Sequence, residues 1–302
     1  MKQKLYPILL SACVLLLYCN EPMTTGPVMT WRGEELVHNN NLINLYPQSH
    51  PLENKVIFIA TGQSAIDAEP GDKLAGESLR EFDQQSKTSK ELYHHAQGLA
   101  FPDYSRDGKR LIFCKKTQTL DIMLMDIESG KIDILVQSDK DDWYPRWSPD
   151  DRQIAFIHDE RLAVTSADNP VPLYPQGITG AVSGLCWSLD GSEIIFAAEQ
   201  NGQSKIYAWH TQTRAQRLLA TNYLSGSWPE LTQPPGGLAE EMGPQLSFRD
   251  GTDIYLFSLK TYKKSCIARD GNMPRWTADR SSILFTRDGN IFRSSVYILL
   301  DG

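Results

Sequence analysis

Two arginines occupy the same position in two similar stretches of the sequence. Residues 144–147 (Tyr-Pro-Arg-Trp) and residues 273–276 (Met-Pro-Arg-Trp) each place an arginine between a proline and a tryptophan. A guanidinium group presents its N–H donors as a planar fork. Arg146 and Arg275 could therefore each bind a carboxylate in bidentate fashion.

Acidic and amide side chains lie near both arginines along the chain. They are Asp139, Asp142, Asp270 and Asn272. A cluster of this kind suits a cationic segment of a partner or a bound cation, and it is also typical of solvated loops. Pairing within the cluster is the alternative to ligand binding for the arginines. We expect Arg146 and Arg275 to pair with neighbouring aspartates such as Asp142 or Asp270.

The sequence contains no motif typical of a catalytic or phosphate-binding site. It lacks the G-x-S-x-G nucleophile elbow and the G-x-x-x-x-G-K phosphate loop. The six histidines are scattered, and none forms a metal-ligand motif. We therefore predict no catalytic residue, no bound metal and no cofactor.

Composition narrows the class of protein further. The chain has 302 residues, of which 41% are hydrophobic, so it can bury a substantial core. Its formal net charge is −7, and no basic run is present. A net acidic chain without a basic patch argues against a nucleic-acid partner.

Residues 1–19 have the features of a bacterial targeting segment. Two lysines precede an apolar run, residues 5–18, that is short for a membrane span of about 20 residues. Leu-Ser-Ala-Cys, ending at Cys13, and Leu-Leu-Tyr-Cys, ending at Cys19, both resemble the lipobox of lipoproteins, in which the cysteine is lipidated. The full length of the apolar run favours Cys19, Cys13 stays open, and an uncleaved anchor is a third alternative. Residues 20–29 have the composition of a linker.

A strand–turn–strand pattern recurs six times after residue 30. Most copies have a proline near the strand start, then an aromatic residue, a Ser/Thr-x-Asp turn and an apolar, β-branched run. The copies begin at Tyr46, Phe101, Tyr144, Gly184, Trp228 and Met273. Repeats of about 40 to 45 residues with a second strand pair in each predict the blades of a β-propeller.

The last repeat has room for only three strands, which would leave an exposed sheet edge. Residues 34–40 near the N-terminus resemble residues 131–137, which form the outer strand of the second repeat in this interpretation. We predict that this N-terminal segment supplies the missing outer strand and closes the ring. A frayed arm is the alternative.

Two residue types recur at fixed repeat positions, and three cysteines lie in or beside apolar strand runs; all of them are interpreted as structural. The aromatic residues are expected in the core between blades, the aspartates in turns, and the cysteines as buried small side chains rather than disulfides. The aromatic residues are Tyr104, Trp147, Trp187 and Trp276; the aspartates are Asp107, Asp150, Asp190 and Asp279; the cysteines are Cys114, Cys186 and Cys266.

The repeats resemble those of the TolB-like six-bladed propellers, also called WD40-like or PD40 repeats, over residues 30–302. The resemblance implies an all-β chain: a single domain with six four-stranded antiparallel blades. It implies the propeller alone and not the Tol–Pal machine, because about 25 residues between the targeting segment and the first repeat leave no room for the N-terminal α/β domain of TolB. Similar propellers occur fused to serine peptidases and in some polysaccharide lyases.

In such a propeller the loops between blades enter the mouth of the central channel. The six candidate ligand- or partner-binding residues are therefore expected there: Asp139, Asp142, Arg146, Asp270, Asn272 and Arg275. We expect a non-catalytic, monomeric, lipid-anchored protein of the bacterial cell envelope, periplasmic or on the outer membrane, that binds an envelope protein or glycan. The alternative is a propeller enzyme, a lyase or hydrolase acting on polysaccharide, with its site at the channel mouth.

Overall fold

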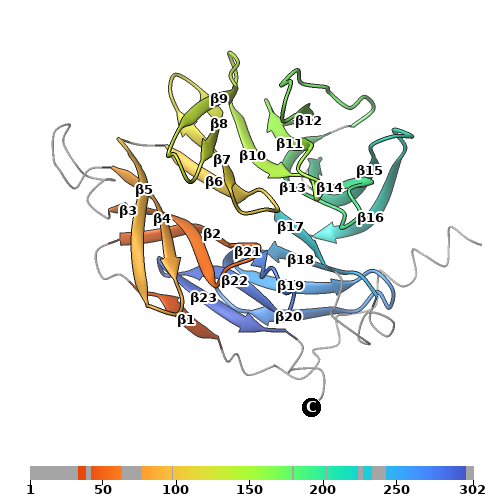
Figure 1. Ribbon diagram of the computed structural model, residues 1–302. Helices are drawn as coiled ribbons and strands as arrows, with labels where there is room; N and C mark the ends of the chain where they lie inside the picture. The colour runs from red at the N-terminus through yellow and green to blue at the C-terminus, as the bar shows by residue number, and fades with distance from the viewer. Residues whose placement is uncertain are drawn as a thin grey trace, which may run out of the picture. The chain divides into compact units, whose positions relative to one another are not determined.

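The computed structural model describes residues 33–38, 42–62, 76–96, 98–178, 180–201, 203–223, 227–232 and 243–296. One compact unit spans Trp31–Gly302. Every described secondary-structure element of this unit is a β-strand, and the strands form six antiparallel sheets arranged around a central axis (Figure 1). No helix long and apolar enough to cross a membrane occurs among the described residues. The six antiparallel sheets confirm the prediction of a six-bladed propeller.

The chain passes through the sheets in order, one blade after another. In blades 1, 2, 4 and 5 the strands pair in sequence order, from the innermost to the outermost. Blade 1 has β2 (Leu42–Ser49), β3 (Lys55–Gly62), β4 (Glu77–Asp83) and β5 (Thr88–His95). Blade 2 has β6 (Leu99–Tyr104), β7 (Arg110–Lys116), β8 (Leu120–Asp126) and β9 (Ile132–Val136). Blade 4 has β13 (Ala181–Trp187), β14 (Glu193–Gln200), β15 (Gln203–His210) and β16 (Gln216–Tyr223). Blade 5 has β17 (Ser227–Thr232), β18 (Gln245–Asp250), β19 (Asp253–Ser258) and β20 (Lys264–Ala268).

Blade 3 departs from the four-stranded plan. It has β10 (Asp142–Trp147), β11 (Gln153–His158) and β12 (Arg161–Ser166). The outer strand is reduced to one bridge, in which Val164 and Leu173 exchange backbone hydrogen bonds of 2.9 and 2.7 Å. Pro170 and Pro172 precede that bridge, and because proline lacks an N–H donor the segment cannot extend the ladder.

The N-terminal strand completes blade 6, as predicted. β1 (Glu34–Val37) pairs antiparallel with β23 (Asn290–Ser295), beside β22 (Ser282–Arg287) and the innermost strand β21 (Asn272–Trp276). Leu36 and Val37 are buried in a cluster with Phe58 and Phe82 of blade 1. The closing strand therefore also seals the interface between the last blade and the first.

Every innermost strand carries a β-bulge, and in five of the six blades it lies at the same repeat position. In blade 3 the pairing of β10 with β11 shifts register between Trp143 and Arg146. Blades 1, 2, 5 and 6 show the equivalent shift, whereas the shift in blade 4 comes earlier in the strand, between Val182 and Gly184. In five blades the bulge holds a large residue with φ between 53° and 61° followed by a proline. These five residues are Tyr46, Phe101, Tyr144, Trp228 and Met273. The prolines thus lie inside the strands rather than at their starts, because a bulge leaves one backbone group out of the ladder.

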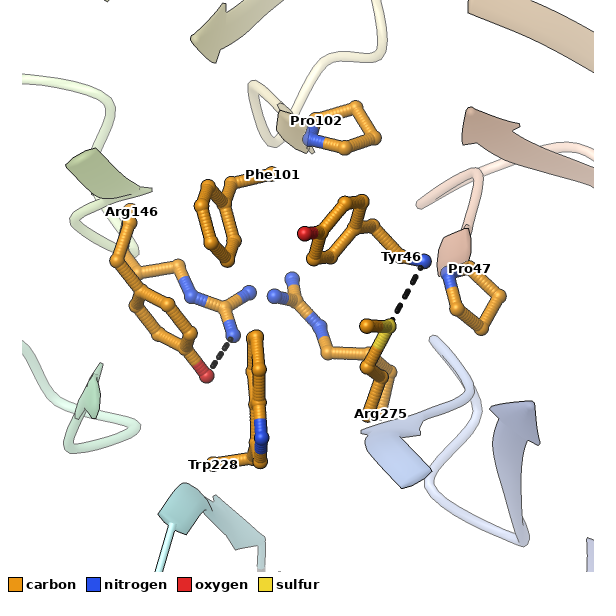
Figure 2. A pocket seen from close by; sticks show the side chains of 9 residues that line it. Tyr46, Pro47, Phe101, Pro102, Arg146, Trp228 and Arg275 are labelled. Carbon is orange, nitrogen blue, oxygen red and sulfur yellow. Dashed lines mark hydrogen bonds between the residues drawn. The ribbon is translucent and has the colours of Figure 1, made fainter. Parts of the chain in front are cut away.

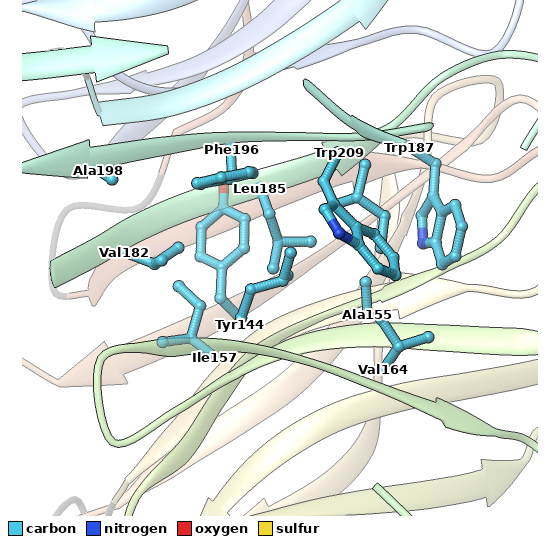
Figure 3. Packing of buried hydrophobic residues seen from close by; sticks show 12 residues of the cluster. Tyr144, Ala155, Ile157, Val164, Val182, Leu185, Trp187, Phe196, Ala198 and Trp209 are labelled. Atoms are coloured by element: carbon cyan, nitrogen blue, oxygen red, sulfur yellow. The ribbon is translucent and has the colours of Figure 1, made fainter. Parts of the chain in front are cut away.

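The recurring aromatic residues lie between blades, as predicted. Trp187 belongs to a buried cluster that joins blades 3 and 4 and includes Tyr144, Phe196 and Trp209 (Figure 3). Its indole N–H donates to the carbonyl of Arg146 in the preceding blade at 3.0 Å. Tyr104, Trp147 and Trp276 likewise each pack against the blade before their own.

The recurring aspartates close the turns between the first two strands of their blades, which confirms their structural role. Each accepts a hydrogen bond of 2.6–2.7 Å from the serine or threonine two residues earlier. In blade 4, Asp190 accepts from the Ser188 hydroxyl and from the backbone N–H of Ser192. These bonds, the Ser188 hydroxyl first, lower the pKa of Asp190 to about 2.

Asp190→Asn should destabilise the protein at neutral pH and about half as much at pH 3. A carboxyl with a lowered pKa contributes stability that is present above its unfolded pKa, 3.8, and is lost as the pH falls through about 2. The difference in urea midpoint between the parent chain and Asp190→Asn should therefore fall by about half between pH 7 and pH 3. Asp288→Asn, which removes an exposed carboxylate from a turn of blade 6, is the matched control for the loss of one negative charge. A difference that is constant with pH would contradict the assignment.

Candidate functional site

One repeat position places a side chain from each blade around the channel. In five blades it directly follows the bulge, and these five residues are Gln48, Asp103, Arg146, Glu230 and Arg275. In blade 4 the equivalent residue is Cys186, two residues after the end of its bulge at Gly184. Four of these residues, Asp103, Arg146, Glu230 and Arg275, form one charged cluster. Arg275 contacts Asp103 at 2.6 Å and Glu230 at 3.3 Å, while Arg146 contacts Asp103 at 3.3 Å and also Glu230. Each carboxylate thus bridges both guanidinium groups.

The two carboxylates of the charged cluster are held differently. Asp103 also accepts the backbone N–H of Trp147 at 2.8 Å, so it is tied to the innermost strand of the next blade. The Glu230 side chain has Arg146 and Arg275 as its partners among the described residues. Arg146 is fixed further by the Tyr144 hydroxyl, which accepts from its Nη2 at 3.0 Å. Of the two carboxylates, Glu230 is therefore the one that another anion can displace more easily from the arginines.

A layer of large side chains closes the channel on one side of the charged cluster. This aromatic layer consists of Tyr46, Phe101, Tyr144 and Trp228, and Met273 lines the same small cavity. Figure 2 shows Tyr46, Phe101 and Trp228 grouped around the two guanidinium groups. Neighbouring rings contact each other with centroids 4.5 to 6.0 Å apart. Only about 20 Å³ remains between this layer and the arginines. The channel is thus blocked here, since the aromatic rings fill its cross-section.

A larger pocket of about 370 Å³ lies on the other side of the charged cluster. Its floor includes the charged cluster, and its rim comes from the turns between first and second strands, with Arg106, Asp151, Leu189 and Arg280. It therefore opens at the face of those turns and not at the face of the loops between blades. The volume falls in the range of about 300–1,000 Å³ that is usual for ligand sites.

Burial dominates the electrostatics of the charged cluster. It raises the pKa of the Asp103 carboxyl to about 6 and that of Glu230 to about 7, although Arg146 opposes both shifts. The arginines stay charged at any physiological pH. Protonation of either carboxyl therefore leaves the charged cluster with excess positive charge at the pocket floor.

Sequence comparisons find no relative of this chain: no family model and no curated protein matches it. Solved structures do match. TolB from Acinetobacter baumannii is 14% identical over 85% of this chain, with a TM-score of 0.60, and the chain covers 64% of that protein. The fold is that of the TolB-like six-bladed propellers.

Enzymes share the same architecture. An oligogalacturonate lyase in complex with manganese is 14% identical over 90% of this chain and 98% of its own, with a TM-score of 0.56. A gluconolactonase from Xanthomonas campestris is 13% identical over 89% and 90%, with a TM-score of 0.64. At these identities the likeness concerns the fold alone, so the function of this TolB-like propeller has to be argued from its own site.

The TolB-like propeller brings together only two of the six candidate residues. Arg146 and Arg275 meet in the charged cluster, but the prediction that they pair with Asp142 or Asp270 is wrong. Asp142 is buried and contacts His158: the distance between Asp142 Oδ1 and His158 Nδ1 is 2.7 Å. Asp270 lies exposed in the loop between blades 5 and 6. Arg146 and Arg275 come after the bulge, further along their strands, and their side chains point into the channel, where they meet Asp103 and Glu230 (Figure 2).

The other two candidates lie in loops or at strand starts, apart from the pocket. Asp139 is exposed, and the side chain of Asn272 caps its own loop by accepting the backbone N–H of Met273 at 2.9 Å. Cys13 and Cys19 lie outside the described residues. Among those that are described, no group of three or more His, Cys, Asp and Glu side chains could hold a metal ion.

Sequence reasoning missed Asp103 and Glu230, although a signal for them was present. Both follow the proline of their repeat, as Phe-Pro-Asp and Trp-Pro-Glu, at the position that Arg146 and Arg275 occupy in theirs. Equivalent positions of a propeller converge on one axis, so charges of opposite sign there are expected to pair. Comparing all six repeats at this position, instead of searching near each arginine, would have identified the charged cluster of the TolB-like propeller.

Proposed function

We propose that this chain is a non-catalytic, lipid-anchored propeller of the bacterial cell envelope, and that it binds a protein or glycan partner in the pocket over the charged cluster. The observation that carries the proposal is a blind pocket whose floor holds one buried and one half-buried arginine, both fixed by ion pairs. The side chains of Arg146 and Arg275 are 6% and 16% exposed. Such preorganised donors lose little entropy on binding, which favours recognition of a ligand.

A filled pocket should abolish partner binding. Leu189 lies half-buried at the rim, in the turn that follows β13, so Leu189→Trp is expected to obstruct the entrance without disturbing the core. Leu52→Trp is the matched control, because Leu52 is 74% exposed in the equivalent turn of blade 1 and does not line the pocket. Envelope material retained by the parent chain and by Leu52→Trp, but not by Leu189→Trp, supports the proposal. Equal retention by all three would place binding elsewhere.

The lipid anchor is tested by labelling. Cells that express the full chain should incorporate radiolabelled palmitate into it, and Cys19→Ser should abolish the label while Cys13→Ser keeps it. The reverse result would move the lipid to Cys13. A chain that stays unlabelled and is released in soluble form without detergent would refute the anchor.

An enzyme acting on polysaccharide is the second candidate. The observation in its favour is Glu230, whose pKa of about 7 beside a positioned arginine is typical of an acid–base catalyst. New reducing ends released from a polysaccharide panel by the parent chain, but not by Glu230→Gln, would establish this function in place of the first.

A further inference from the structure

We propose that the pocket binds the C-terminal carboxylate of a peptide between Arg146 and Arg275, and that this carboxylate replaces Glu230 as the latter takes up a proton. The inference rests on the proposed function and names the chemistry of the partner. It starts from the charged cluster, in which the two guanidinium groups share two carboxylates. A ligand carboxylate needs the geometry that Glu230 already occupies.

Glu230 is suited to be displaced and Asp103 is not. Asp103 keeps the backbone N–H of Trp147 as a third partner, whereas the Glu230 carboxylate contacts only the arginines among the described residues. When Glu230 is protonated it becomes a weak acceptor for two cations. An ionised carboxylate of the ligand can then displace the Glu230 carboxyl and contact both arginines in the same way.

The sign of the ligand charge follows from which groups can titrate. A carboxyl can be neutralised by a proton, but a guanidinium group cannot lose one, so the charged cluster can become cationic and not anionic. The rim carries two arginines, Arg106 and Arg280, and one acidic residue, Asp151. The pocket therefore favours an anion, although the whole chain carries a net charge of −7.

The other groups that face the charged cluster do not compete for this proton. Burial raises the pKa values of the Tyr144 hydroxyl and the Cys186 thiol, so both stay neutral. Burial also raises the pKa values of Glu230 and Asp103, but the Trp147 N–H that Asp103 accepts favours its ionised form, so Glu230 takes up the first proton. The remaining neighbours are the Gln48 amide and the charged rim residues Arg106, Asp151 and Arg280.

The walls of the pocket favour a peptide end over a sugar. Trp147 and Trp187 are each 7% exposed, so they offer too little ring surface for stacking on a sugar ring. Pro149 and Leu189 add apolar surface suited to an aliphatic side chain. A pocket of about 370 Å³ admits only the end of a chain, and capture of a terminal carboxylate is an established mode of peptide recognition.

The test compares two equimolar random-sequence mixtures of N-acetylated tripeptides that differ only at the C-terminus, one with a free carboxylate and one amidated. The free-acid mixture should raise the melting temperature of the protein and the amidated mixture should not. Binding should tighten by up to about tenfold per pH unit as the pH falls from 8 towards 6, because one proton is taken up. Calorimetry in buffers of different ionisation enthalpy should count that proton.

Glu230→Gln isolates the displaced carboxylate. It should bind the free-acid mixture more tightly than the parent chain at pH 8, with little change towards pH 6. Its melting temperature and circular dichroism without ligand establish that it is folded. Should the variant not fold, the proton count on the parent chain decides instead.

Equal stabilisation by both mixtures, or no stabilisation by either at pH 6, would overturn the inference. So would stabilisation by a hexuronic acid monosaccharide in place of the tripeptides, which would identify an acidic glycan as the partner. These outcomes are distinct from failure of the proposed function. The latter requires that Leu189→Trp leaves retention of envelope material unchanged.

Discussion

Asp103→Ala is expected to destabilise the protein by about 3–5 kcal/mol at pH 8, the usual cost of removing one partner from a buried ion pair. The Asp103 side chain is 7% exposed and contacts Arg146, Arg275 and the backbone N–H of Trp147. Its removal leaves two arginines to share Glu230 alone. Because a guanidinium group cannot neutralise itself, the excess charge stays in the folded state.

Asp103→Asn is the matched variant, because its amide oxygen can still accept the Trp147 N–H while the charge is lost. We expect about half the effect of Asp103→Ala. Urea unfolding followed by tryptophan fluorescence gives both free energies by linear extrapolation. A cost below about 1 kcal/mol for Asp103→Ala would show that water, rather than the charged cluster, solvates the arginines in the folded protein.

Removal of the closing strand is the second change with a large expected effect. A chain that begins at Trp31 keeps β1 and should unfold at the same temperature as the full chain. A chain that begins at Leu42 loses β1, exposes the edge of β23 and uncovers the cluster shared with blade 1. It should melt at a much lower temperature or aggregate through the freed edge.

Leu36→Asp should act like the longer deletion. Leu36 is 6% exposed, so the new carboxylate would be buried without a partner, at a cost of at least about 3 kcal/mol. Glu35→Gln on the same strand is the control and should cost less than about 0.5 kcal/mol, since Glu35 is exposed. Similar melting temperatures for the chains that begin at Trp31 and at Leu42 would mean that blade 6 is stable with three strands.

The sequence by itself determined the architecture of this protein. Each repeat carries its own turn chemistry, as in Ser148 and Asp150, and its own apolar strand, so each blade is specified within about 45 residues. The N-terminal strand was also predictable, because residues 34–40 match the outer strand that the last repeat lacks. The single bridge that replaces the outer strand of blade 3 follows from prolines that are visible in the sequence.

Only the tertiary structure decided which charges meet. Arg146 pairs with Asp103 and Glu230, 43 and 84 residues away, and Arg275 pairs with Asp103 across 172 residues. Asp142 and Asp270, which are close to the arginines in the sequence, do not pair with them. Both aspartates come before the bulge of their repeat, whereas both arginines come after it. A closed ring brings equal strand positions onto one axis whatever their separation along the chain. The ion-pair partner of each charged residue is therefore set by the symmetry of the repeats and by the position of that residue directly after the bulge of its strand.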